Sequence, residues 1–324
     1  MNDESSAPRL SVIIPIYNEE DNLLPLQEAL RPALEATGLS HEIIYCDDGS
    51  RDSSPGVLEN IARNHPGVQV LFLRRNFGQT AAIAAGIDHA RGNVLILMDA
   101  DLQNDPRDIP KLLAKLDEGY DIVSGWRKDR KDPFFSKRLP SRIANWIISW
   151  ITGVHIHDHG CTLKAYRREV LDRVSLYGDM HRFLTVLGHW KGARIAEVEV
   201  THHPRLRGKS KYSLNRIFKV LLDLITVKFF GSYSTKPIYI FGGTGAVLLG
   251  MSFLSGAVVV VMKLMFRHSM IRNPLLLFTV MLIILGILFI QIGILAEILI
   301  RIYHESKSEK PYRIRETINL KRPG

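Results

Sequence analysis

Cysteine is scarce in this chain of 324 residues. Only Cys46 and Cys161 are present, and two thiols cannot build the framework of bridges that holds small secreted domains together. This scarcity excludes a disulfide-rich scaffold and is typical of a catalytic domain in the reducing cytosol. An apolar leader is also absent, because the first eight residues are polar and include Asp3 and Glu4. We therefore expect no signal peptide at the N-terminus.

Acidic residues are in deficit. Asp and Glu number 33 against 42 Lys and Arg, which gives a formal net charge of +9. A positive surplus favours anionic partners such as a membrane surface, nucleic acid or a phosphorylated substrate. No nucleic-acid-binding module is recognisable in the sequence. We therefore expect lipid and phosphate ligands and no nucleic-acid partner.

Apolar runs long enough to cross a bilayer are missing before Ser234, but two follow it. They cover roughly residues 238–262 and 275–300, and each exceeds the approximately 20 residues that a membrane-spanning helix needs. A buried core helix is the alternative, but two such runs in succession favour a membrane hairpin. Basic residues cluster before the first run and after the second, so the positive-inside rule places both ends in the cytoplasm.

The segment 94–103 joins an apolar strand to a pair of carboxylates. The run Val-Leu-Ile-Leu-Met is typical of a buried strand in a parallel sheet, and Asp99 and Asp101 follow it directly. Unpaired carboxylates beside a core are costly, whereas Mg²⁺ and Mn²⁺ prefer oxygen ligands and are often shared with substrate phosphates. The pattern indicates a metal site, and a solvated turn with polar caps is the alternative.

Strands and helices alternate through the first two thirds of the chain. Strand candidates lie at residues 10–14, 42–46, 68–73, 94–98, 122–124 and 195–200, and helical patterns separate the first five of them. A helix pattern after the first strand is interrupted by Pro25 and Pro32. This alternation predicts right-handed βαβ units and an α/β fold with a mostly parallel sheet.

Three motifs come at the ends of these strands. They are Pro15-Ile-Tyr17-Asn18-Glu19, Asp47-Asp48-Gly49-Ser50 and Asp99-Ala-Asp101-Leu-Gln103. Together they resemble family 2 inverting glycosyltransferases with the GT-A fold, a Rossmann-like α/β architecture. The two apolar runs narrow the resemblance to polyprenyl-phosphate glycosyltransferases, the group that contains dolichyl-phosphate mannose synthases and bacterial GtrB-type glucosyltransferases. The resemblance covers nearly the whole chain.

The resemblance implies roles for individual residues. Pro15, Tyr17, Glu19 and Asp48 would surround the nucleotide of a sugar donor, Asp99 and Asp101 would hold Mg²⁺ or Mn²⁺ on its diphosphate, and Gln103 would lie nearby. Asp158 matches the catalytic aspartate, and we count Asp101 with it. Positions that would bind the acceptor phosphate are Arg127, Lys137, Arg138, Ser141, Arg207, Lys209 and Lys211. Solvated basic loops, or a basic cluster beside anionic lipid, are the alternative for these positions.

Two histidine- or arginine-rich stretches have alternative interpretations. His155, His157 and His159 surround Asp158 with a spacing that suits zinc, although the resemblance favours Asp158 as the functional residue. A phosphate monoester has a second pKa of about 6 and hardly needs a base, so Asp158 is either a base or an orienting group. The stretch 74–79 is either a basic rim near the diphosphate or a solvated loop, and the second interpretation is slightly favoured.

Two amphipathic helices are predicted beside the membrane. In the stretch 143–151, Trp146 and Trp150 fall on one apolar face next to a basic loop, which favours the membrane interface over packing on the core. Residues 214–225 repeat the pattern. The expected organisation is a GT-A domain at residues 1–212, a juxtamembrane helix at 213–233, a transmembrane hairpin at 234–303 and a basic cytoplasmic tail at 304–324.

The predicted activity is inverting transfer of a hexose to polyprenyl phosphate at the cytoplasmic face of a bacterial plasma membrane. From the resemblance, the first choice of substrates is UDP-glucose and undecaprenyl phosphate, with GDP-mannose or a modified sugar as alternatives. A processive polysaccharide synthase would need more helices and a Q-x-x-R-W motif, which is missing from the sequence. A non-catalytic scaffold or flippase partner would not require the four carboxylates of Asp48, Asp99, Asp101 and Asp158. A homo-oligomer is expected, and a tetramer is the form that the resemblance suggests.

Overall fold

A computed structural model describes most of the chain. The described residues are 8–128, 139–172, 174, 176, 180–204, 238–266, 274–305 and 310–320, without the side chains of 139–144, 238, 266, 297 and 300–305. The chain forms two compact units, one of Met1–Val227 with Lys310–Gly324 and one of Lys228–Glu309. Each unit is described separately below.

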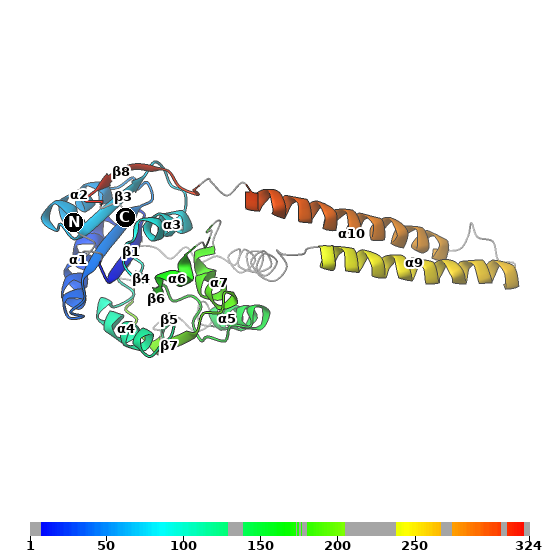
Figure 1. The fold of residues 1–324 in the computed structure, drawn as a ribbon, viewed down its shortest axis with the longest axis horizontal. Coiled ribbons are helices and arrows are strands. Elements are labelled where there is room, and N and C mark those ends of the chain that lie inside the picture. The colour runs from blue at the N-terminus through cyan, green and yellow to red at the C-terminus, as the bar shows by residue number, and fades with distance from the viewer. Residues whose placement is uncertain are drawn as a thin grey trace, which may run out of the picture. The chain divides into compact units, whose positions relative to one another are not determined.

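The first unit is built on an eight-stranded sheet with the order β7-β5-β6-β4-β1-β2-β3-β8 (Figure 1). The strands are β1 (Leu10–Ile16), β2 (His41–Asp47), β3 (Val68–Leu73), β4 (Val94–Leu97), β5 (Ile122–Trp126), β6 (Lys164–Arg167), β7 (Ile195–Glu199) and β8 (Ile314–Ile318). The central strands β4, β1, β2 and β3 run parallel to one another, whereas β6 and β8 are antiparallel to their neighbours. The predicted α/β fold is therefore confirmed.

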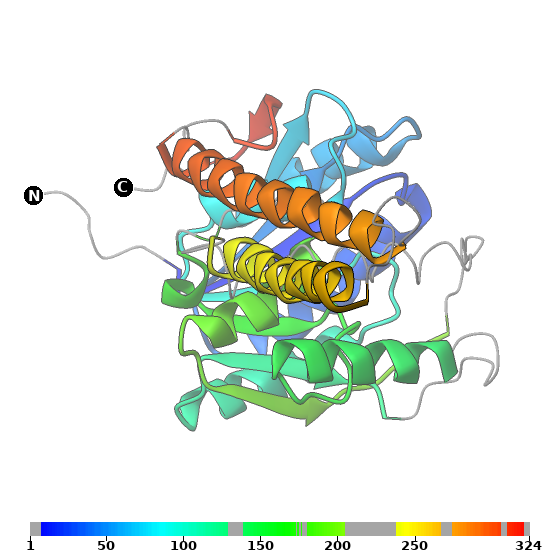
Figure 2. The ribbon, with the colours of Figure 1, turned by 90° about the vertical axis from the view of Figure 1, so that its right-hand side faces the viewer.

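Helices cover both faces of this sheet because its central strands are apolar on both sides (Figures 1 and 2). On β1, Val12 and Ile14 pack into one core while Ile13 packs into the other. The first core takes residues from α1 (Glu20–Glu35), α2 (Ser54–Asn64) and α4 (Ile109–Asp117). The second takes residues from α3 (Gln79–His89), α5 (Leu139–Thr152), α6 (Arg168–Leu171), η4 (Met180–Phe183) and α7 (Leu184–Trp190).

Helix α1 differs from its sequence expectation. Pro25 and Pro32 were expected to interrupt it, yet the helix is continuous from Glu20 to Glu35. Both prolines lie on its exposed side, where water can bind the carbonyls that lose a donor. The buried side keeps Leu23, Leu26, Leu30 and Leu34 in the core, and this burial holds the helix together.

The C-terminal segment was expected to be a separate tail at residues 304–324. Within it, strand β8 pairs antiparallel with β3, and Val70 lies opposite Ile318 (Figure 1). Asn319 donates hydrogen bonds to the backbone oxygens of Ala62 and Val68, at 2.7 and 3.1 Å. Residues 310–320 are therefore part of the first unit and contribute an edge strand to its sheet, which local sequence did not reveal.

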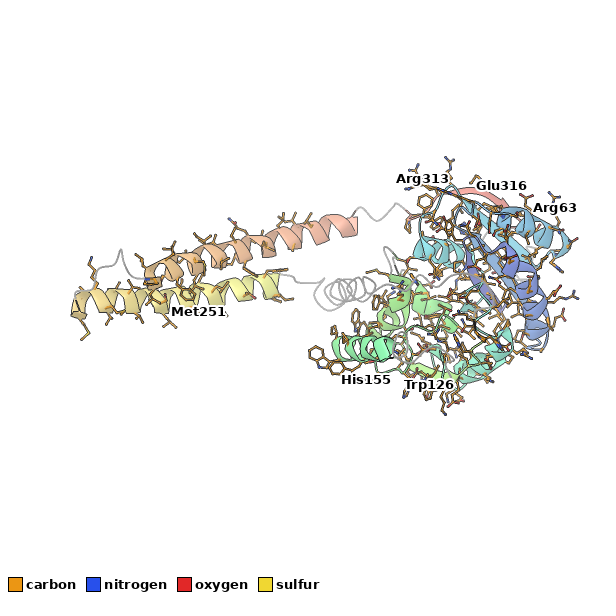
Figure 3. The ribbon with its side chains drawn as sticks, turned by 180° about the vertical axis from the view of Figure 1, so that it is seen from behind. Arg63, Trp126, His155, Met251, Arg313 and Glu316 are labelled. Carbon is orange, nitrogen blue, oxygen red and sulfur yellow. The ribbon has the colours of Figure 1, made fainter. Side chains whose placement is uncertain are left out.

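The second unit contains the helices α9 (Ile238–Phe266) and α10 (Pro274–Glu305). Residues Tyr239–Met265 and Pro274–Ala296 are long and apolar enough to cross a membrane. A Cβ on Gly245 would lie 2.6 Å from the carbonyl oxygen of Gly286, so glycine permits the close packing of the two helices. Most other side chains of the hairpin, such as Met251, point outward (Figure 3), unlike those of a soluble core helix.

Candidate functional site

The three sequence motifs meet at one edge of the sheet. Ile16 lies opposite Asp47, and Ile13 opposite Leu97, in the parallel register of β1 with β2 and β4. The carboxyl ends of the three strands therefore coincide, and this edge is where open α/β sheets bind ligands. Of the predicted nucleotide and metal residues, Pro15 lies within β1, and the others come after the ends of β1, β2 and β4: Tyr17, Glu19, Asp48, Asp99, Asp101 and Gln103.

The turn after β1 is joined to the turn after β2. Asn18 has a left-handed backbone with φ of 57°; its N–H donates to Ser50 Oγ at 3.0 Å, and its Oδ1 accepts from the N–H of Arg51 at 2.8 Å. The Glu19 N–H donates to Ser54 Oγ at 2.9 Å. These bonds leave the ring of Tyr17 at the surface, 41% exposed. An exposed aromatic ring on a fixed turn suits the stacking of a nucleotide base.

Asp48 lies at the predicted edge of the sheet, directly after β2, and has hydrogen-bond partners that the sequence did not indicate. Its two carboxylate oxygens accept the backbone N–H groups of Phe77 and Gly78 at 2.7 and 2.8 Å. Burial raises its pKa, and these two N–H groups oppose the rise. Both oxygens are thus engaged by the loop Arg74–Gly78, so Asp48 holds that loop in addition to any bond to a nucleotide.

Gly49 allows this loop to come close. Its φ is +68°, and a Cβ there would lie 2.6 Å from the backbone carbon of Arg75. Arg74 and Arg75 are exposed, and the Arg75 guanidinium lies 4.6 Å from the centroid of the Phe77 ring. The loop is consequently packed against Asp48 and Gly49 with its two arginines exposed, and a basic rim near the diphosphate stays a prediction.

Asp99 and Asp101 lie together at the end of β4. Burial raises the pKa of Asp99 to about 7, the negative charge of Asp101 adds to the rise, and Thr162 and Arg127 oppose it. Asp99 Oδ1 accepts a hydrogen bond of 2.8 Å from Gln79 Nε2. Two crowded carboxylates, one of them hard to ionise without a counter-charge, are the electrostatic signature of a cation site.

The turn after these carboxylates is tight. Leu102 has a positive φ of 58°, and the Gln103 N–H donates to Asp101 Oδ1 at 3.2 Å. Among the described residues, no group of three His, Cys, Asp or Glu side chains is placed to hold a metal ion. The oxygens of Asp99 and Asp101 fit Mg²⁺ or Mn²⁺, and further ligands would come from a diphosphate and water.

Arg127 and Asp158 form a buried, two-pronged ion pair. The Nε–Oδ2 and Nη2–Oδ1 distances are 2.7 and 3.0 Å, and the side chains are only 11% and 4% exposed. Asp158 Oδ1 also accepts the N–H of Gly160 at 3.1 Å. The sequence assigned these two residues separately, to acceptor phosphate and to catalysis. In the structure their side chains bind each other.

The three histidines around Asp158 do not converge. His157 stacks on Trp126 with centroids 4.3 Å apart, and its Nδ1 lies 2.8 Å from Glu197 Oε2. His159 is buried beside Ser149, and burial with the charge of Lys164 lowers its pKa to about 3. The alternative of a zinc site at His155, His157 and His159 is therefore not supported, because these described residues form no group placed to hold a metal ion.

Some residues that support the site were not identified from the sequence. Lys164 is buried on β6, and its Nζ donates to the carbonyl of His159 and to Thr185 Oγ1, both at 3.1 Å. Burial lowers the pKa of Lys164. Gln79 also supports the site by donating a hydrogen bond to Asp99. Glu197 does so by binding His157. Lys164 is the first residue of β6, a strand of four residues that also contains Arg167, so no local apolar pattern marked it.

Several predicted residues are outside the described part of the chain. These are Lys137, Arg138, Arg207, Lys209 and Lys211, together with the juxtamembrane segment 213–233; for Ser141 only the backbone, in α5, is described. The predicted interface helix is described. Trp146 and Trp150 of α5 are 68% and 74% exposed and stack on each other with centroids 6.5 Å apart. Exposed paired tryptophans agree with a membrane-facing surface but do not test it.

The chain is similar to known proteins whose descriptions agree with one another. The family model "Glycosyl transferase family 2" matches residues 11–175. Dodecaprenyl-phosphate galacturonate synthase of Rhizobium johnstonii is 40% identical, over 97% of this chain and 94% of that protein. Undecaprenyl-phosphate 4-deoxy-4-formamido-L-arabinose transferase of Proteus mirabilis is 35% identical, over 98% of this chain and 96% of that protein.

Solved structures share the fold. Glucosyl-3-phosphoglycerate synthase of Mycobacterium tuberculosis, in complex with Mn²⁺ and UDP-glucose, aligns with a TM-score of 0.52 and 16% identity. The alignment covers 68% of this chain and 79% of that one. At this identity the comparison shows the fold alone, and it agrees with the GT-A architecture of the first unit.

Proposed function

Since this chain belongs to glycosyltransferase family 2, we propose that it transfers a sugar from a nucleotide donor to a polyprenyl phosphate at a membrane. The observation that carries the proposal is the meeting of two groups at one sheet edge. Asp99 and Asp101, which follow β4, supply a site for a cation. Arg127 follows β5, and because β4 and β5 both run antiparallel to β6 between them, these residues lie at the same edge of the sheet. The names of the relatives in Rhizobium and Proteus support polyprenyl phosphate as the acceptor.

The proposed reaction is a single inverting displacement. An oxygen of the acceptor phosphate attacks the anomeric carbon, the bond from that carbon to the donor diphosphate breaks, and the nucleoside diphosphate leaves with the bonding electrons. A bound Mg²⁺ or Mn²⁺ would neutralise charge on the leaving diphosphate. The protein supplies position and electrostatic stabilisation, because the ionised acceptor is already nucleophilic.

Arg127 is the residue proposed to receive the acceptor phosphate. Its guanidinium has five N–H donors in a rigid plane, and Asp158 takes two of them at 2.7 and 3.0 Å. This two-pronged ion pair fixes the plane of the guanidinium. Asp158 is thus proposed as a positioning residue, and this role is favoured over that of a base because both of its oxygens accept hydrogen bonds.

The identity of the sugar is a separate proposal. Glucose from UDP-glucose was the first choice from the sequence, but the names of the two relatives specify galacturonate and 4-deoxy-4-formamido-L-arabinose. We therefore rank a hexuronate above glucose, with other modified sugars next. The 40% identity over nearly the whole chain supports this order.

A donor panel tests the proposal. Purified full-length protein is incubated with undecaprenyl phosphate, Mn²⁺ or Mg²⁺, and UDP-galacturonate, UDP-glucose, GDP-mannose and UDP-linked formamido-arabinose, and lipid-extractable sugar is measured. We expect transfer from one donor, and EDTA should abolish it. If a folded protein that binds nucleotide transferred no sugar from any donor, the non-catalytic scaffold would replace the proposal.

Binding of Mn²⁺ is expected to weaken as the pH falls below about 7. The raised pKa of Asp99, about 7, means that a proton competes with the cation below this pH, whereas above it the carboxylate is already ionised. The Kd for Mn²⁺ should therefore be about fivefold higher near pH 6 than near pH 7 and nearly constant above pH 8. Calorimetric titration measures this, and a Kd that is independent of pH would contradict it.

Strand β8 supports the predicted membrane topology. It belongs to the same sheet as β3, which agrees with a hairpin whose two ends lie on one side of the membrane. The basic residues that flank the spans support the cytoplasmic side. A homo-oligomer stays a prediction, which the mass of the detergent-solubilised protein would test.

Cysteine labelling in intact bacterial cells tests this topology. The natural cysteines Cys46 and Cys161 are buried, which keeps the background low. A cysteine at Ser269, between the two spans, should react with a membrane-impermeant maleimide, whereas one at Thr317 on β8 should react only after the cells are opened. Labelling of Thr317→Cys from outside would reverse the assignment.

A further inference from the structure

Strand β8 reaches the loop that Asp48 holds. The pairing of β3 with β8 continues to Leu73 opposite Ile314, and the N–H of Arg74 donates to the carbonyl of Arg313 at 2.9 Å. Arg74 is the first residue of the loop Arg74–Gly78. The C-terminal strand therefore supports this loop by backbone hydrogen bonding at the point where β3 ends (Figures 1 and 3).

Tyr312, two residues before β8, anchors helix α3. Tyr312 is 5% exposed and packs in the core that contains the alanines of α3. Its hydroxyl donates to Asp88 Oδ2 at 2.7 Å, and Lys310 Nζ lies 3.0 Å from the same oxygen. Burial and the Asp88 carboxylate raise the pKa of Tyr312, so the hydroxyl keeps its proton and remains a donor.

The supported elements carry contacts into the site. Phe77 and Gly78 of the loop donate to Asp48, and Gln79, the first residue of α3, donates to Asp99. The segment 310–318 thus supports the loop after β3 through Arg313, and the C-terminal end of α3 through Tyr312 and Lys310. Without β8, β3 would be an edge strand whose last residue and loop lack this support.

We propose that the C-terminal strand is a positioning element of the donor site, and that the anchor from Tyr312 to Asp88 keeps the loop Arg74–Gly78 ready to receive the nucleotide. This inference rests on the proposed function, because it assumes that the edge with Asp48 and Asp99 binds a nucleotide sugar. A loop that is ordered before binding costs less to immobilise, so loss of the brace should appear as weaker donor binding.

Nucleotide affinity tests the inference independently of sugar transfer. The Kd for UDP with Mn²⁺, or for GDP if UDP does not bind, is measured by calorimetry for full-length wild-type protein and for Tyr312→Phe. Loss of one hydrogen bond to a partly exposed carboxylate should raise the Kd about threefold to fivefold. Tyr312→Ala also removes the buried ring and should raise it tenfold or more.

A double-mutant cycle identifies the anchor. In an Asp88→Ala background, Tyr312→Phe should cause no further rise in Kd, because its partner is already gone. The matched control is Tyr120→Phe, which changes a tyrosine two residues before β5 and should leave the Kd unchanged. In the transfer assay, the KM for the nucleotide sugar should rise in Tyr312→Phe while the KM for polyprenyl phosphate stays constant.

Each outcome decides the inference. An unchanged Kd in folded Tyr312→Phe and Tyr312→Ala, even with a lower melting temperature, would show that β8 only stabilises the fold. If Tyr312→Ala does not fold, the coupling between Tyr312→Phe and Asp88→Ala decides in its place. Wild-type protein that binds nucleotide but transfers no sugar would overturn the proposed function and leave this inference standing, whereas failure to bind either nucleotide would overturn both.

Discussion

Replacing Asp101 with asparagine should lower the rate of sugar transfer by about 1000-fold or more, because a carboxylate that holds the cation on the diphosphate is lost. Asp99→Asn should have a similar effect. The transfer rate at saturating donor and acceptor is the measurement, with Mn²⁺ affinity measured alongside. Both variants should bind Mn²⁺ more weakly, and excess Mn²⁺ should restore only part of the rate.

Asp101→Asn should not destabilise the metal-free protein. The charge of Asp101 contributes to the raised pKa of Asp99, so the two carboxylates repel each other when no cation is bound. Removing one charge relieves this repulsion, and the melting temperature of Asp101→Asn in EDTA should equal or exceed that of wild-type protein. Loss of activity with unchanged or higher stability distinguishes a functional carboxylate from a structural one.

The matched control for this prediction is Asp117→Asn. Asp117 lies on α4, and its side chain is 70% exposed and 3.8 Å from Arg9, so it belongs to a surface pair that contributes little. Its substitution should leave both transfer and metal binding unchanged. Transfer by Asp101→Asn within about tenfold of the wild-type rate would argue against the metal site, since such site carboxylates contribute far more.

Breaking the Arg127–Asp158 pair should produce the second largest effect. Asp158→Asn is expected to lower kcat/KM for polyprenyl phosphate by about 100-fold or more, since Arg127 loses the partner that fixes its direction. The substitution also leaves a buried guanidinium without its counter-charge, which typically costs about 3–5 kcal/mol of folding free energy. Transfer kinetics and thermal unfolding therefore belong in the same experiment.

The kinetic pattern separates a positioning role from a base. If Asp158 positions Arg127, the KM for the acceptor should rise strongly, Arg127→Lys should give a similar pattern, and the pH profile of kcat should keep its wild-type shape. If Asp158 is a base, kcat should fall with little change in KM, and the acidic limb of the pH profile should disappear. The second pattern would contradict the positioning role.

A control for general destabilisation is available in the same domain. Asp121 is 20% exposed and lies 3.8 and 3.5 Å from Arg167 and Arg194, away from the carboxyl ends of the central strands. Asp121→Asn removes a half-buried pair without touching the proposed site. It should lower the melting temperature with no change in the KM for polyprenyl phosphate.

The sequence was informative where a property depends on local pattern. Apolar runs predicted the central strands, and the residues that follow them predicted which side chains gather, because parallel strands bring their carboxyl ends to one edge. For this reason the positions of Asp48, Asp99 and Asp101 beside the turn after β1 were foreseeable. Two runs of apolar residues were likewise enough to predict α9 and α10, since helix length and composition are local.

Partners that are distant in the chain were not foreseeable. Asp48 was expected to face a nucleotide, yet its oxygens bind N–H groups 29 and 30 residues away. Asp158 and Arg127 are separated by 31 residues, and the hydrogen bond from Tyr312 to Asp88 spans 224. No periodicity records such pairings, because each depends on which loop ends the fold brings together.

Sequence alone therefore determined the fold class, the edge of the sheet where the chemistry is expected and the two apolar helices. Only the tertiary structure decided that Asp158 binds Arg127, that the three histidines do not form a metal site and that the C-terminal segment adds an edge strand beside β3. The physical reason is the range of the interactions. Burial patterns are set by neighbours along one element, whereas hydrogen bonds and ion pairs of the site depend on directions and distances between elements.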